Sequence, residues 1–248
     1  MKDTDLYGNY TSTTMLRGFE EGELTAWTAK YFRHHLLAHL PADREAHILD
    51  VGCGYGRYIK AMMAIGYTNV TGIDISAEQI EYGRNRLGLA ASIEVADPIP
   101  FLEAAKQSYQ AILLLDVLEH LDVEYSISLL AQIRKSLSDD GLLIIQVPNG
   151  LSPLCVNRYG DVTHKRAYTV HSIEQSLKMA GYDSETIQHF PLGPFPADWK
   201  SMVRTMLWRR VISPLISLYL RIAVGGRMGG IYTENLLSTA TRKRTVSV

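Results

Sequence analysis

Four aspartates and one glycine-rich turn are the groups of this chain best suited to bind a charged ligand. Asp50 precedes the turn Gly52-Cys53-Gly54-Tyr55-Gly56, and Asp74, Asp97 and Asp116 each follow a later apolar run. Glycine lets a ligand approach the backbone closely, and a helix that begins after such a turn offers unpaired N–H groups. Carboxylates accept hydrogen bonds from amino and hydroxyl groups. The set therefore predicts a site for a ligand that carries both kinds of group.

Two histidines are the candidate bases of the chain. His120 directly follows Glu119, and His164 ends the segment Gly160-Asp161-Val162-Thr163-His164. Imidazole changes its protonation near neutral pH, so it can remove a proton from an acceptor hydroxyl. A structural interpretation stays open for both. Asp161 and His164 would then tie down their loop, and His120 would pack around a ligand.

Short apolar runs alternate with helical periodicity, and this alternation predicts the elements that position these residues. It favours right-handed βαβ units and a mainly parallel sheet. The expected strands are 47–51, 69–74, 92–96, 111–115, 142–147, 186–190 and 234–240. The expected helices between them are 55–65, 77–87, 123–137 and 170–180. The four aspartates then lie at successive strand ends, where open α/β sheets bind ligands.

The predicted fold is an α/β domain with a doubly wound, mainly parallel sheet of seven strands and helical additions. Residues 1–41 form an N-terminal helical cap, and residues 42–190 form the α/β core with a loop at 150–168. Residues 191–233 form a basic helical insertion, and residues 234–248 form the last strand and a tail.

The composition is that of a globular enzyme without disulfides. The chain has 248 residues, of which 46% are hydrophobic and 21% charged, with a formal net charge of −1. Cys53 and Cys155 are far apart and have no Cys or His at metal-binding spacing, which favours reduced thiols. The start of the chain is acidic, unlike a signal peptide. The longest apolar run, 211–220, is far shorter than the roughly 20 residues that span a bilayer. We expect cytoplasmic residence.

The glycine turn departs from the dinucleotide-binding fingerprint. That fingerprint would require a glycine at Arg57, so the departure counts against NAD. Over residues 48–149, the turn and the strands after it resemble class I S-adenosylmethionine-dependent methyltransferases. The resemblance implies a Rossmann-like methyltransferase fold and S-adenosylmethionine as the co-substrate.

The resemblance also implies a role for each acid. Asp50 would meet the ammonium group of the cofactor, Asp74 would take both ribose hydroxyls, and Asp97 would accept the adenine amino group. Asp116 would lie near the sulfonium, together with His120. Any one acid alone could be a helix cap or loop residue. The resemblance depends on all four aspartates at successive strand ends, with the glycine turn after the first. The implied cofactor-binding residues are Asp50, Gly52, Cys53, Gly54, Gly56, Asp74, Ile75, Asp97, Asp116 and Val117.

The acceptor is indicated by a second resemblance. The segment from Gly160 to His164, followed by Tyr168-Thr169, is similar to methyltransferases of polysaccharide synthesis that modify sugar hydroxyls. It implies O-methylation of a glycan or glycan precursor, with His164, His120 and Asp161 as the catalytic residues. One alternative is a lipid or quinone O-methyltransferase. Another is a non-catalytic partner or sensor that only binds S-adenosylmethionine.

Two further features suggest roles beside the cofactor. Asp116-x-x-Glu119-His120 resembles a divalent-ion cluster of some quinone and RNA-end methyltransferases, but Asp116 is expected at the cofactor. We therefore assign no metal. Tyr7 and Tyr10 could form a lid or serve as surface anchors.

The end of the chain is basic. From Trp199 to Val248 there are nine Lys or Arg residues and one acidic residue. In 199–224, tryptophans and aliphatic residues mix with arginines, which suits peripheral contact with the inner face of a membrane or with a lipid carrier. A helical lid or a dimer face is the alternative. No nucleic-acid module is evident, and the sequence determines no oligomeric state.

Overall fold

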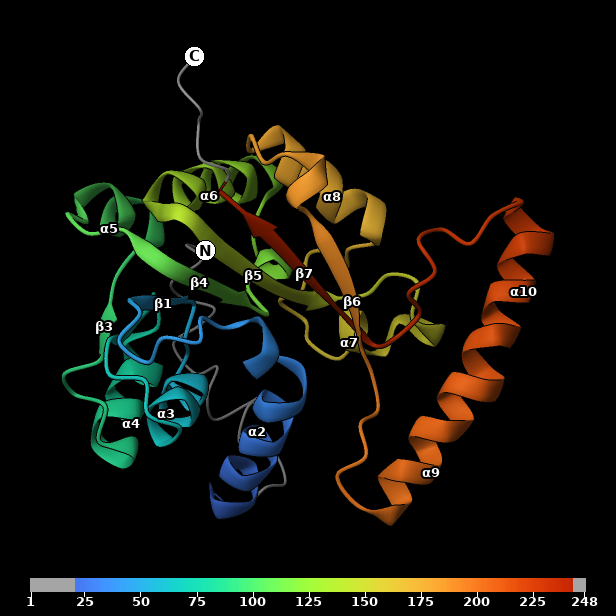
Figure 1. Cartoon of the computed structure of the whole chain (residues 1–248), viewed down its shortest axis with the longest axis horizontal. Coiled ribbons are helices and arrows are strands. Elements are labelled where there is room, and N and C mark those ends of the chain that lie inside the picture. The colour runs from blue at the N-terminus through green and yellow to red at the C-terminus, as the bar shows by residue number, and fades with distance from the viewer. Residues whose placement is uncertain (1–20, 243–248) are drawn as a thin grey trace.

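The computed structural model describes residues 21–242 and contains one seven-stranded sheet with helices around it (Figure 1). The strands lie in the order β3-β2-β1-β4-β5-β7-β6. They are β1 (Ile48–Val51), β2 (Val70–Asp74), β3 (Ile93–Val95), β4 (Tyr109–Leu115), β5 (Leu137–Pro148), β6 (Gln188–Leu192) and β7 (Asn235–Thr241). The predicted seven-stranded sheet is therefore confirmed.

Strand direction divides the sheet into two parts. The strands β1 to β5 pair in parallel, whereas β7 runs antiparallel to both β5 and β6. The chain builds outward from β1 in one direction and then returns to β4 on the other side. Such a reversal of strand order opens a crevice at the carboxyl ends of the strands, which is where open α/β sheets bind ligands.

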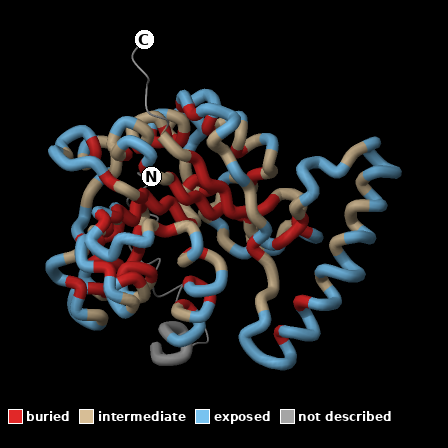
Figure 2. The backbone as a smooth tube through the Cα atoms, in the orientation of Figure 1, coloured by how far each residue is buried: buried red, intermediate tan, exposed pale blue. Residues whose placement is uncertain are grey.

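Helices cover both faces of the sheet. One apolar cluster joins the sheet to α5 (Pro98–Ala104), α6 (Val123–Ser136) and α8 (Val170–Met179). The other joins it to α2 (Glu21–His35), α3 (Arg57–Ala64) and α4 (Ala77–Leu87). Figure 2 shows the buried backbone concentrated along the strands between these two layers. The sheet is thus a rigid frame for the residues at its carboxyl edge.

Local capping explains where several helices begin. Ser76 accepts a hydrogen bond from the amide of Gln79 at the start of α4, and Thr169 forms a capping box with Ser172 at the start of α8. Helix α5 was not among the helices expected from the sequence. Asp97 caps that helix and Pro98 occupies its first turn, so two residues typical of a turn here begin a helix.

The expected N-terminal cap is described only in part. Helix α2 is followed by the 3₁₀ turn η2 (Leu37–His39), and the buried Phe32 of α2 and Leu36 between the two helices belong to the core. Tyr7 and Tyr10 lie outside the described residues.

Two segments leave the sheet at its carboxyl edge. The first contains η4 (Pro153–Cys155) and α7 (Val156–Tyr159) and connects β5 to α8. The second lies between β6 and β7 and contains α9 (Trp199–Leu207), the π-helical turn η6 (Trp208–Ile212) and α10 (Ser213–Val224). In Figure 1 these last helices stand beside the sheet as one long rod. Within residues 21–242, no helix has the length and apolar content needed to cross a bilayer.

Candidate functional site

The glycine-rich turn lies tightly against the end of β4. Gly52 and Gly54 adopt φ values of 73° and 57°, in the left-handed region that glycine enters without strain. A Cβ on Gly52 would overlap the side chain of Val117, which follows β4. Gly56, with φ 84°, is the N-cap of α3 and packs on Leu89. The turn can therefore lie this close to the end of β4 only with glycine at its first position.

Asp74 connects the turn to the second strand. Its Oδ2 accepts a hydrogen bond of 2.8 Å from the amide of Gly54, and its Oδ1 accepts one of 2.8 Å from the amide of Ser76. Burial raises the pKa of Asp74, while these backbone donors lower it. The carboxylate thus fixes the turn and keeps further lone pairs for hydroxyl donors.

Asp50 is a buried carboxyl group in the floor of the site. It is 1% exposed, and its Oδ2 has no hydrogen-bond partner. Burial raises the pKa of Asp50 to about 7, against the opposing charge of Arg57. A cation beside this oxygen would stabilise the carboxylate. The ammonium group of an amino-acid ligand meets that requirement, so Asp50 and the glycine turn fit S-adenosylmethionine.

Asp116 is held at the end of β4 by residues that the sequence analysis missed. The amide of Gln146 donates to both Asp116 oxygens at 2.8 Å, and Arg57 lies 3.6 Å from Oδ2. Tyr31 of α2 in turn donates a 2.7 Å hydrogen bond to Gln146. Asp116 itself has φ 58°, an uncommon value for a residue with a side chain. No sequence spacing signals Gln146 or Tyr31, because they reach Asp116 only through the tertiary fold.

Asp97 and Ile75 flank the region expected to hold adenine. Asp97 Oδ1 accepts hydrogen bonds from the amide of Ile99 and, at 2.8 Å, from the hydroxyl of Tyr125. Ile75 is 41% exposed and lines the same cavity. An exposed apolar side chain beside a carboxylate suits a flat base that carries an amino group.

His164 lies beside Glu119 in the part of the site that is expected to hold the acceptor, called the acceptor side below. Its Nδ1 lies 2.7 Å from the carbonyl oxygen of Asn157, which can only accept, so Nδ1 carries the proton. In the neutral ring, Nε2 therefore carries the lone pair, and it lies 3.9 Å from Glu119 Oε1. The Glu119 carbonyl accepts from the amide of Lys165 at 2.8 Å, which holds the histidine loop in place.

Asp161 and His120 support this loop from the other side. Asp161 Oδ1 accepts hydrogen bonds from both the amide and the hydroxyl of Thr163, at 2.8 and 2.6 Å. The Thr163 oxygen lies 2.9 Å from Nδ1 of His120. Burial, together with the neighbouring His164, lowers the pKa of His120 to about 4. His120 is thus neutral at neutral pH and a weak base.

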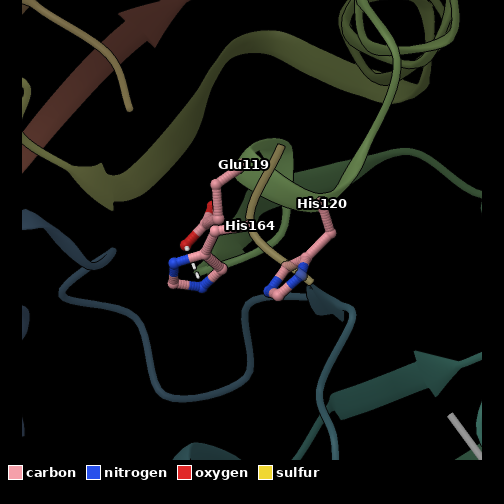
Figure 3. Close-up of side chains that lie close together, drawn as sticks. All are labelled: Glu119, His120 and His164. Carbon is pink, nitrogen blue, oxygen red and sulfur yellow. Dashed lines mark ion pairs between the residues drawn. The ribbon is translucent and has the colours of Figure 1, made fainter. Parts of the chain in front are cut away.

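Glu119, His120 and His164 form a candidate cation site (Figure 3). One ligand atom from each lies within 4.8 Å of the other two. Glu119 is fully buried, and both of its oxygens lack a hydrogen bond. Burial raises the pKa of Glu119 well above its usual range, and the charge of Asp116 raises it further. The sequence analysis assigned no metal and grouped Asp116 with this cluster. The structure instead adds His164, while Asp116 pairs with Gln146 and Arg57.

One cavity of about 660 Å³ joins the two sides of the site. Every site residue predicted from the sequence lines it except Gly56, which is the N-cap of α3. The lining residues with predicted roles are Asp50, Gly52, Cys53, Gly54, Asp74, Ile75, Asp97, Asp116, Val117, His120, Asp161 and His164. Asp50 and His164, which are 114 positions apart in the sequence, therefore line the same cavity.

Comparison with known sequences also identifies a methyltransferase domain. Residues 24–189 match the family described as methyltransferase domain. The chain is 29% identical over 197 residues to the O-methyltransferase cnsE of Penicillium expansum, covering 72% of this chain and 67% of that one. It is 31% identical over 108 residues to the sphingolipid C9-methyltransferase of Candida albicans, covering 40% of this chain. The match spans only 21% of that relative's length.

Comparison with solved structures shows the same fold. A SAM-dependent methyltransferase from Archaeoglobus fulgidus superposes with a TM-score of 0.63 at 18% identity, covering 88% of this chain and 94% of that one. Phosphoethanolamine N-methyltransferase 2 of Haemonchus contortus, solved with S-adenosyl-L-methionine, gives 0.59 at 14% identity, covering 96% and 60%.

Proposed function

This chain belongs to the methyltransferase-domain family, and on that premise we propose that it is an S-adenosylmethionine-dependent O-methyltransferase. The proposed acceptor is a sugar hydroxyl of a glycan or glycan precursor. The acceptor side of the cavity supports this choice because it is lined by side chains that can hydrogen-bond a polyol: Asn157, Asp161, His164, Lys165 and Asn235.

The orientation of His164 is the observation that carries the proposal. The Asn157 carbonyl fixes the proton on Nδ1, so Nε2 of the neutral ring carries the lone pair, and His164 lines the cavity. A hydroxyl oxygen must lose its proton as it attacks a methyl group, and Nε2 can accept that proton. His120 is the weaker base, since its pKa is lowered to about 4.

The donor side of the cavity supplies alignment. Asp50 and the turn amides would hold the amino-acid end of S-adenosylmethionine, Asp74 its ribose and Asp97 its adenine. When bound, the cofactor supplies a methyl group on a sulfonium. Transfer of this methyl group to the acceptor oxygen would be an in-line displacement, and the sulfur would keep the electron pair of the broken bond. The acceptor proton moves to Nε2 of His164. In-line displacement of this kind depends mainly on holding donor and acceptor in register.

A lipid hydroxyl is the second candidate acceptor. A partial relative is named as a sphingolipid C9-methyltransferase, a name that gives a lipid substrate but a carbon acceptor. The support for a lipid from this structure is that Leu154 and Val162 are exposed in the loop whose Asp161 lines the cavity. Both candidates require the same base and cofactor residues. They differ in where the methylated product partitions.

Methyl-labelled S-adenosylmethionine incubated with source-cell extract tests the proposal. We expect label in polysaccharide or sugar-nucleotide material with the intact chain, and none with His164→Ala. Label in the organic phase alone would replace the sugar acceptor by a lipid or quinone. Cofactor binding without any transfer to the extract would favour a sensor. Loss of transfer with EDTA, restored by a divalent ion, would make Glu119, His120 and His164 a metal centre that polarises the acceptor oxygen.

A further inference from the structure

Helix α9 turns its apolar side outward. Trp199, Met202, Val203 and Met206 recur at helical spacing, and each is at least 44% exposed. A surface helix normally buries such a stripe. Here the buried positions are Ser201 and Thr205, whose hydroxyls donate to backbone carbonyls of their own helical turn. The small polar side of α9 is therefore buried, and the apolar side is left to another partner.

Helix α10 repeats this pattern. Leu215, Leu218, Tyr219 and Ile222 again follow i, i+3, i+4 and i+7, and they are 55% to 78% exposed. Figure 2 shows the rod exposed along most of its length. We call residues 199–224 the apolar arm. Isolated exposed apolar residues need no explanation, but a continuous set on one rod marks an interaction surface.

The charge of the arm favours an anionic partner. Residues 199–233 contain Lys200, Arg204, Arg209, Arg210, Arg221 and Arg227 and no acidic residue. Arg209 and Arg210 are exposed in the middle of the rod. Outward apolar side chains flanked by cations match the boundary of a bilayer, where acyl chains lie beneath anionic head groups.

The arm is rooted at the mouth of the cavity. It leaves the sheet after Leu192 and returns at Asn235, which pair with each other. Asn235 also pairs with Pro148 at the carboxyl end of β5, and both residues line the cavity. The loop beside this mouth exposes further apolar side chains, among them Leu154 at 88% and Val162 at 99%. The arm and this loop thus both expose apolar side chains, and both connect to strand ends or residues that line the cavity.

We propose that the apolar arm, together with the exposed side chains of residues 154–162, docks the protein on the surface of an anionic lipid bilayer. The arm lies on the membrane without spanning it, and the cavity mouth faces the lipid. An acceptor carried in the bilayer could then enter without leaving the membrane. The docking surface does not depend on which hydroxyl is methylated.

A second copy of the chain fits the arm less well. In a two-fold dimer the same surface faces itself. The arms of both copies would bring their cations together with no acid to offset them, and like charges at an interface oppose association. Anionic head groups remove this repulsion.

Vesicle sedimentation with the full-length protein tests the proposal. We expect binding to vesicles of phosphatidylcholine mixed with phosphatidylglycerol, weaker binding to phosphatidylcholine alone, and partial release by salt. The double variant Leu218→Gln/Ile222→Gln should weaken binding to both vesicles by at least about tenfold. The double variant Arg209→Gln/Arg210→Gln should weaken binding by about fivefold per charge, and only on the anionic vesicles.

Met179→Gln is the matched control, because Met179 is exposed on α8, away from the arm, and its loss should leave vesicle binding unchanged. Circular dichroism and calorimetric S-adenosylmethionine binding show whether each variant is folded. Absence of vesicle binding by the folded protein would overturn the proposal, as would arm variants that bind vesicles normally. A dimer that the Leu218→Gln/Ile222→Gln change splits, without any effect on vesicle binding, would assign the arm to a second copy.

Discussion

The cofactor loop, residues 50–56, and the acceptor loop, residues 150–168, both enter the left-handed backbone region, but with different residues. The cofactor loop uses Gly52, Gly54 and Gly56, whereas the acceptor loop uses Leu154 and Cys155, at φ 62° and 47°. The left-handed conformation costs a residue with a side chain roughly 1–2 kcal/mol, and glycine avoids that cost. The cofactor loop is thus relaxed, and the acceptor loop is held under strain.

The difference reflects how each loop is fixed. The cofactor loop follows directly from β1, and Asp74 holds its amide from the neighbouring strand. The acceptor loop depends on distant contacts, such as the Lys165 amide on the Glu119 carbonyl. Strained residues persist only where surrounding structure holds them, and they concentrate at functional sites. The comparison indicates that binding the cofactor is built into local sequence, whereas positioning the base depends on the whole fold.

The largest effect expected is on the acceptor side. His164→Ala should lower kcat by about 10² to 10⁴-fold, since it removes the proposed general base, and leave the Kd for S-adenosylmethionine unchanged. Steady-state methyl transfer and calorimetry measure the two quantities. His171→Ala, at an exposed position on α8, is the control. Weakened cofactor binding by His164→Ala would remove the functional division between the loops.

Asp74→Ala should change the Kd for S-adenosylmethionine more than it changes kcat. It removes the acceptor proposed for two ribose hydroxyls and releases the Gly54 amide, so the Kd should rise about 10- to 100-fold. Asp74→Asn keeps the shape and loses the charge, and it should fall between Asp74→Ala and the unchanged chain. If calorimetry found normal binding for both variants, Asp74 would have no role in holding the cofactor.

Gly52→Ala tests the glycine turn itself. The added Cβ meets a strained φ and overlaps Val117, so we expect a loss of about 1–3 kcal/mol in the free energy of unfolding, with weaker cofactor binding. Gly88→Ala is closely matched, because φ there is 71° and nothing lies near the added Cβ. Urea unfolding of both variants separates the overlap from the backbone strain. Equal losses would mean that contact with Val117 is unimportant.

Cofactor binding should depend on pH through Asp50. The pKa of this group is raised to about 7, so the folded chain retains a proton that the unfolded chain releases near pH 4. This term lowers the stability of the unliganded protein as pH rises from about 4 to 7. An ammonium ligand prefers the carboxylate, so its affinity should rise about tenfold from pH 6 to pH 8. Calorimetry at several pH values measures the slope, and Asp50→Asn should flatten it.

The smallest effect expected is relief of strain in the acceptor loop. Leu154→Gly removes a left-handed side chain that is almost fully exposed, so stability should rise by up to about 1 kcal/mol. Val162→Gly, in the same loop, lacks a positive φ and should give a small loss instead. Thermal unfolding distinguishes the two changes. A loss for Leu154→Gly would show that its side chain has a packing role.

The strands and most core helices could be predicted from the sequence because their signals are local. Each strand is signalled by an apolar run and by the glycine or acid that directly follows it. The strands β1, β2 and β4 were therefore predicted correctly. The last expected strand, 234–240, is confirmed as β7 (Asn235–Thr241), which lies between β5 and β6. Helix α5 was missed because Asp97-Pro98 is equally typical of a turn and of a helix start.

The sequence by itself determined the sheet, the cofactor loop and the candidate histidines. Only the tertiary structure decided their partners: Gln146 and Tyr31 on Asp116, Glu119 beside His164, and the outward direction of the apolar arm. The physical reason is distance along the chain. Backbone preference and hydrophobic periodicity act over a few residues. The side chains that line a cavity come from distant parts of the sequence and meet only when the whole chain has folded.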